Sequence, residues 1–165
     1  MKLLGLAAIA LCAAAFALEL RRRMRLRLTM LDGICELCRE ISVSIRYERR
    51  PLGEIMLGLP GDASAFARIC AEQLSRGLDF RAAWRYACEN CAELAALSAD
   101  ERALLTALGE RLGRSDADGE LELLEGVSGR FESARDAVRD ELPSRTKLTT
   151  ACSLTGGLLL LIFLI

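Results

Sequence analysis

The sequence predicts an all-α protein, with a bundle of about six helices between an N-terminal and a C-terminal transmembrane helix. Three observations carry this prediction. Each end of the chain is a long apolar run, no stretch in between alternates with the period of two that marks a half-buried strand, and prolines and glycines divide the middle into helix-length segments. The expected boundaries are residues 1–20, 21–147 and 148–165.

The N-terminal run extends from Leu3 to Leu18 without a polar side chain. As a helix it is about 24 Å long, close to the thickness of the hydrocarbon core of a bilayer. A cleavable signal peptide is the alternative, but its positive charge should precede the apolar run. Here a cluster of five arginines follows the run instead: Arg21, Arg22, Arg23, Arg25 and Arg27. We therefore expect a retained membrane helix, with Glu19 paired to Arg23 near the interface.

The C-terminal run, from Leu148 onward, mirrors the first and has Arg145 and Lys147 just before it. Because both basic flanks face the middle of the chain, residues 21–147 are predicted to be cytoplasmic and both termini to point outward. The arginine cluster also suits contact with membrane lipids that carry anionic head groups. Its role as a topology signal is sufficient to explain it.

Capping and breaking residues place the helices of the middle segment. The first helix is expected from about Arg25 to Arg49, and Pro51 opens a short second one in its first turn. The other four are expected from Asp62 or Ser64 to Gly77, from Asp79 onward, from the capping box Ser98–Glu101 to Gly113, and from about Ser115 to Pro143, which should kink or break the last helix.

Two CxxC pairs, Cys35–Cys38 and Cys88–Cys91, raise the question of a metal site. Both are expected inside helices, on faces that large apolar residues also occupy, whereas zinc-binding pairs lie on tight turns. Buried free cysteine packs as a small hydrophobic residue, so packing is the favoured interpretation. A zinc or redox site remains open if the two helices face each other.

The composition argues against several classes of function. The formal net charge of −1 gives no basic field for nucleic acid, and the sequence has no histidine, the commonest general base and zinc ligand. No P-loop, nucleophile elbow or recognisable carboxylate pair is present, and residues 115–122 fit helix capping better than a calcium loop. We therefore expect no enzyme activity, cofactor, bound metal or small-molecule substrate.

Short motifs follow one another along the whole chain: KLLG at the start, EISVSIRYERRPLGEI over Glu40–Ile55, Arg81-Ala-Ala-Trp84, LGERLGRSD over Leu108–Asp116, and a Gly- and Leu-rich end. In this order, between two apolar ends, they resemble the stage III sporulation protein AB family of endospore-forming bacteria. The chain departs from the family where Glu120 stands for a frequent Gln and Arg50 for a frequent Thr. Neither CxxC pair belongs to the pattern.

The resemblance implies a subunit of a complex built across the two membranes between mother cell and forespore, located in the mother-cell membrane that faces the forespore. The middle domain is similar to the helical platform domains of type II secretion and type IV pilus inner-membrane proteins, which contact a secretion-type ATPase. The implied function is a non-catalytic platform that docks such an ATPase and other membrane proteins of the complex. The alternative is a membrane-anchored thiol- or metal-binding protein that uses the two CxxC pairs.

The segment from Tyr47 to Glu54 is the candidate partner-binding site. Pro51 pushes Arg50 away from helical geometry and so fixes a turn at one end of the bundle. The residues predicted to meet a partner are Arg49, Arg50 and Glu54, because arginine suits bidentate contact with carboxylates. A simple solvated turn is the competing interpretation.

Overall fold

The computed structural model describes the backbone of residues 2–48, 50–60 and 64–164, and the side chains of residues 14–48, 50–60 and 64–141. Over these residues the protein is all-α, as predicted, with six α-helices and no strand. The helices are α1 (Lys2–Val43), α2 (Leu52–Leu57), α3 (Ala65–Ser75), α4 (Phe80–Asn90), α5 (Ala99–Arg111) and α6 (Ala117–Leu164). A π-helical turn, η1 (Ser44–Glu48), extends α1, and a 3-10 turn, η2 (Ala92–Ala96), joins α4 to α5.

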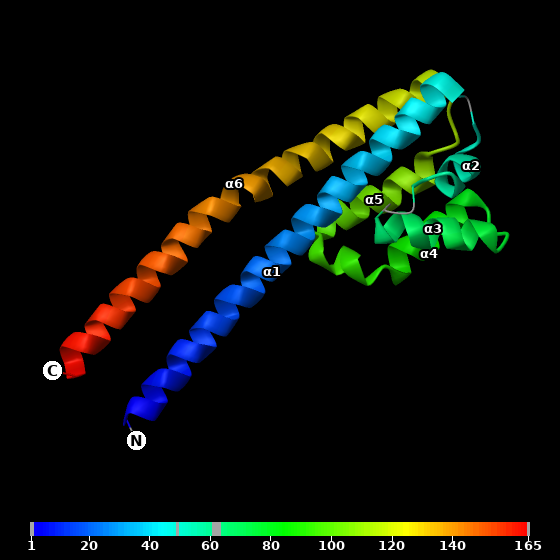
Figure 1. Ribbon diagram of the computed structural model, residues 1–165. Helices are drawn as coiled ribbons and strands as arrows, with labels where there is room; N and C mark the ends of the chain where they lie inside the picture. The colour runs from blue at the N-terminus through cyan, green and yellow to red at the C-terminus, as the bar shows by residue number, and fades with distance from the viewer. Residues whose placement is uncertain (1, 49, 61–63, 165) are drawn as a thin grey trace.

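The two longest helices, α1 and α6, form an antiparallel pair, and α2–α5 pack against one side of it (Figure 1). Both helices supply fully buried apolar side chains to one core, among them Leu31, Ile34 and Ile41 from α1 and Leu124 and Phe131 from α6. The first buried residue of α1 in the described range is Met30. The described part of α1 before Met30 therefore contributes no fully buried residue to the core.

Trp84 holds the short helices together. Its indole is 1% exposed and packs edge-on against Phe66 of α3, with ring centroids 4.9 Å apart. Its Nε1–H donates a hydrogen bond to the carbonyl oxygen of Leu105 in α5 at 3.0 Å. A single side chain of α4 thus links α3 to α5, and its one polar group is satisfied inside the core.

The capping residues predicted for α3, α4 and α5 are confirmed. Ser64 Oγ and Asp79 Oδ1 each accept a hydrogen bond from the backbone N–H three residues on, at 3.3 and 2.8 Å. Ser98 and Glu101 form both hydrogen bonds of the predicted capping box. Gly113, just beyond α5, has φ +80°, a conformation that favours glycine, and it ends the helix as expected.

Three boundaries differ from the prediction. Residues 1–20 and 25–49 were expected as separate helices, but α1 is continuous to Val43 because no proline interrupts it. Pro51 is the N-cap of α2 rather than part of its first turn. Helix α6 runs without interruption through Pro143 to Leu164, so of the two predicted outcomes, a kink or a break, the break is wrong. An interior proline removes only one backbone hydrogen bond, which a long helix can lose.

Within the described residues, no helix contains a stretch long and apolar enough to cross a membrane. The expected transmembrane helix over 148–165, and most of the one over 1–20, lie outside the residues whose side chains the structure describes. Both membrane helices therefore stay predictions.

Candidate functional site

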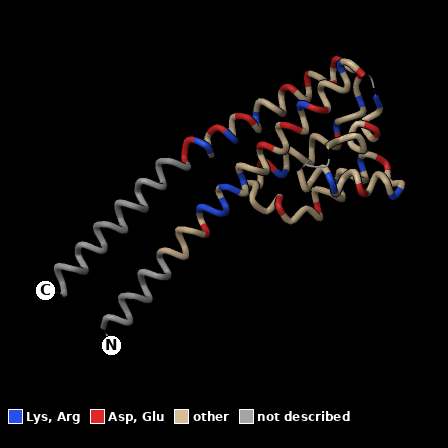
Figure 2. The backbone as a smooth tube through the Cα atoms, viewed as in Figure 1, with Lys and Arg blue, Asp and Glu red and all other residues tan. Residues whose placement is uncertain are grey.

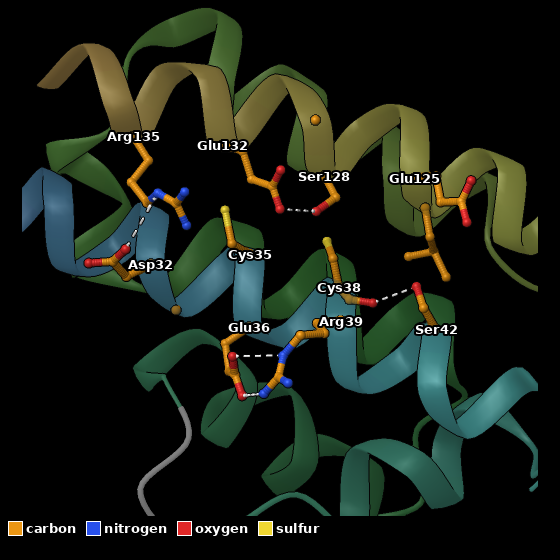
Figure 3. A pocket seen from close by; sticks show the side chains of 13 residues that line it. Asp32, Cys35, Glu36, Cys38, Arg39, Ser42, Glu125, Ser128, Glu132 and Arg135 are labelled. Carbon is orange, nitrogen blue, oxygen red and sulfur yellow. Dashed lines mark hydrogen bonds and ion pairs between the residues drawn. The ribbon is translucent and has the colours of Figure 1, made fainter. Parts of the chain in front are cut away.

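The first CxxC pair, Cys35 and Cys38, lies on α1 with both thiols directed toward α6 (Figure 3). In the second pair, Cys88 belongs to the last turn of α4, but Cys91 ends that helix with ψ 102°. The prediction that both pairs lie inside helices is therefore wrong for Cys91, because the chain leaves α4 there to form η2. Among the described residues, no group of three or more Cys, Asp or Glu could hold a metal ion.

Burial disfavours the thiolate form of three of the described cysteines. It raises the pKa of Cys35 to about 11 and the pKa of Cys38 and Cys70 to about 12. Metal binding and thiol exchange both use the thiolate, which is scarce at neutral pH when the pKa is this high. These cysteines are best explained as packing residues, and the thiol- or metal-binding alternative gains no support from them.

A groove of about 670 Å³ lies between α1 and α6, and Cys35 and Cys38 are among the residues that line it (Figure 3). Apart from Glu132, which accepts a hydrogen bond from Ser128 at 3.4 Å, its charged side chains form ion pairs with one another or with close neighbours. Asp32 lies 3.8 Å from Arg135, Arg39 pairs with Glu36, and Glu125 lies 3.2 Å from Arg46 just outside the groove. The groove thus offers few uncompensated charges to a ligand.

The predicted docking turn lies at the end of α1 far from the N-terminus (Figure 1). Arg49 is outside the described residues. Arg50 Nη1 lies 3.1 Å from Glu48 Oε2, and its Nε lies 3.9 Å from Glu54 Oε2. Tyr47 is 75% exposed, and the Arg50 and Glu54 side chains are 45% and 61% exposed. The turn therefore exposes an aromatic ring and a short chain of ion pairs.

This turn forms one wall of an open groove of about 750 Å³, which we call the end groove. Apolar lining comes from Ile45, Pro51, Leu52 and Phe80, and the opposite wall is formed by residues 113, 115–118 and 120, around the start of α6. The end groove thus unites the turn, the start of α4 and the segment after α5, which are far apart in the sequence. All three stretches carry motifs noted above.

Glu120 fixes the wall of the end groove. Its Oε1 accepts hydrogen bonds from the backbone N–H groups of Gly113, Arg114 and Ser115, at 3.0, 3.0 and 2.9 Å. The residue is 5% exposed, and its Oε2 is buried without a hydrogen-bond partner among the described residues. The sequence reading assigned this acidic stretch only to helix capping. The signal that could have revealed this role is the spacing of Glu120 and Gly113. An acidic residue in the first turns of a helix can accept hydrogen bonds from the backbone N–H groups that follow a glycine at the end of the preceding helix.

The arginine cluster after the apolar run is partly engaged within the chain. Arg23 Nε lies 3.0 Å from Glu19 Oε1, which confirms the predicted pair. Arg27 Nη2 donates to Glu101 Oε1 at 2.7 Å, and Glu101 also closes the capping box of α5. Arg27 therefore ties α1 to the bundle, a structural role that the sequence pattern did not reveal.

We expect Glu101→Gln to lower the free energy of unfolding by about 1–2 kcal/mol at pH 7, because glutamine keeps the capping box but loses the charge that pairs with Arg27. Desolvation alone would raise the pKa of Glu101, but hydrogen bonds from Arg27 and Ser98 outweigh it and hold the pKa below its usual value. The stabilisation is fully present at pH values above the pKa that the Glu101 carboxyl has in the unfolded chain. It is lost as the pH falls through the lower pKa that this carboxyl has in the folded protein. Urea unfolding from pH 7 to pH 2 measures it.

The matched control is Asp100→Asn, which removes the same charge from the exposed neighbouring position in α5. Its stability should stay within about 0.5 kcal/mol of wild type. A difference between Glu101→Gln and wild type that persists unchanged at pH 2 would contradict the ion-pair explanation.

Comparison with known proteins gives one family match. The family model described as stage III sporulation protein AB matches residues 2–165, nearly the full chain. No curated protein and no solved structure matches the chain.

Proposed function

Because the chain belongs to the stage III sporulation protein AB family, we propose that it is a non-catalytic, membrane-anchored platform that docks a secretion-type ATPase in a sporulation complex. The end groove and the adjoining turn Tyr47–Glu54 form the docking surface in this proposal. The basis for the ATPase is the similarity of the middle domain to secretion platform domains, which is an argument by analogy.

The observation that carries the proposal is the position and composition of the docking surface. It lies at the far end of α1 from the apolar N-terminal run (Figure 1). An exposed tyrosine, Tyr47, and an arginine, Arg50, occupy it, and these residue types are enriched in protein interfaces. A protein anchored at its apolar ends would present this surface away from the membrane.

Anchoring is supported by the described end of the N-terminal run. Phe16 and Leu18 are 71% and 65% exposed, so large apolar side chains point outward just before the arginine cluster. Figure 2 shows the arginines of residues 21–27 gathered in one band on α1, next to this apolar stretch. Basic residues that flank a membrane helix keep that end of the helix on the cytoplasmic side of the membrane. They also attract the anionic head groups of lipids. The family points to which membrane this is. We propose the mother-cell membrane that faces the forespore.

We expect a fluorescent protein inserted after Pro60 to fluoresce, because the positive flanks predict that residues 21–147 are cytoplasmic. Alkaline phosphatase inserted at the same point should be inactive, since it folds only after export. The same two reporters fused before Lys2 should give the opposite pattern. Phosphatase activity after Pro60 would overturn the proposed topology.

We expect the double change Arg49→Glu and Arg50→Glu to weaken ATPase binding by about tenfold or more, because charge reversal places carboxylates against the partner's carboxylates. Co-purification of the full-length chain with the secretion-type ATPase of the sporulation complex, followed by spore counts, measures the effect. Helicity and melting temperature should stay near those of wild type.

The control reverses two exposed arginines elsewhere, Arg68→Glu and Arg102→Glu, which change the net charge equally. If both double variants bind the ATPase as wild type does, the docking surface lies elsewhere. If wild type itself does not bind the ATPase, the platform proposal is wrong.

A further inference from the structure

The end groove carries an excess of negative charge. Asp116, Asp118 and Glu120 line one wall. Among the described residues that line the groove, the only basic one is Arg50, and Glu48 and Glu54 already flank it. The groove therefore has a local field that favours a cation, although the whole chain has a net charge of −1.

Glu120 makes this field unusually persistent. A carboxylate that is 5% exposed is poorly screened by water and salt, and here only Oε1 receives hydrogen bonds. Its Oε2 is buried with no donor among the described residues, which is costly for an isolated chain. A basic group placed in the groove would lower that cost.

The lining of the end groove favours a basic peptide over a metal ion. These carboxylates do not belong to any group of described residues that could hold a metal ion. The same groove is lined by Ile45, Pro51, Leu52 and Phe80, which suit a large apolar side chain. An apolar lining beside separated carboxylates is complementary to an extended peptide rather than to a free ion.

We propose that the end groove binds a segment of the partner protein in which arginine or lysine flanks a large apolar side chain. The apolar side chain lies against Leu52 and Phe80, while the basic groups pair with Asp118 at the rim and compensate the charge of Glu120. This inference rests on the proposed docking function and concerns the end groove itself. A basic segment of the partner enters the groove, whereas the partner's carboxylates meet arginine on the adjoining turn.

The test uses the full-length chain in nanodiscs of neutral phosphatidylcholine, so that a basic peptide does not bind the lipid. The probe is a fluorescein-labelled, capped Arg-Leu-Phe-Arg peptide, with Glu-Leu-Phe-Glu as its acidic counterpart. Fluorescence anisotropy should show binding of the basic peptide alone, weakening as NaCl rises from about 50 to 300 mM. We expect a loss of about tenfold or more for Glu120→Gln, and about threefold for the rim variant Asp118→Asn.

Glu120→Gln keeps an oxygen for the three amides, and Asp118→Asn changes an exposed side chain, so neither should unfold the protein. The matched control, Glu122→Gln, removes the same charge from an exposed position of α6 outside the groove and should bind as wild type does. Equal peptide binding by all four proteins, or none by wild type, overturns the inference.

ATPase binding measured in parallel separates the two proposals. If wild type binds the ATPase and Glu120→Gln and Asp118→Asn bind it equally well, the groove chemistry is wrong while the platform function stands. If the variants lose the peptide but no form binds the ATPase, the groove chemistry stands and the platform function fails.

Discussion

Replacing Gly109 with alanine is expected to lower the free energy of unfolding by about 3–4 kcal/mol. Gly109 lies in α5 directly beneath the indole of Trp84, and a Cβ atom there would overlap the indole Cδ1 and Nε1. The indole has little room to move, since it is 1% exposed and donates a hydrogen bond to the carbonyl of Leu105. The gain of about 1 kcal/mol in helix propensity is too small to offset the overlap.

The measurement is urea unfolding of the full-length chain in detergent, followed by circular dichroism and by tryptophan fluorescence, which reports the single Trp84. Gly126→Ala is the matched control, because no atom lies within 4 Å of a Cβ added to Gly126 in α6. That variant should be more stable than wild type by about 0.5–1 kcal/mol. Equal effects of the two substitutions would show that Trp84 does not rest on Gly109.

Replacing Glu120 with alanine is expected to cost about 2–3 kcal/mol, because three backbone N–H groups lose a charged acceptor. The loss of stability is limited because residues 113–115 are exposed, so that water replaces part of the hydrogen bonding to their amides. Glu120→Gln should retain most of the stability, since its amide oxygen takes the place of Oε1.

Hydrogen exchange provides the specific readout for this prediction. The amides of Gly113, Arg114 and Ser115 should exchange faster in Glu120→Ala, while the amides of α3 keep their wild-type rates. Glu122→Ala, at an exposed position two residues on, is the control and should change stability by less than about 0.5 kcal/mol. Unchanged exchange rates at the three amides would contradict the prediction that hydrogen bonds to Glu120 protect them.

The sequence by itself determined the fold class and most helix boundaries. Caps at Ser64, Asp79 and Ser98 are local signals, because each side chain bonds a backbone group three residues away. Glycine at 113 likewise marks a helix end through its own backbone conformation. Such features depend only on neighbouring residues, and the sequence shows them directly.

Only the tertiary structure decided what the residues of the short motifs do in three dimensions. The Leu-Gly repeat reads as one pattern, yet Gly109 makes room for Trp84 and Gly113 supplies a positive φ and an amide for Glu120. Likewise the arginines of residues 21–27 look equivalent, but Arg27 alone reaches Glu101, 74 residues away. Contacts between distant segments depend on how helices pack, and periodicity within one helix carries no information about its neighbours.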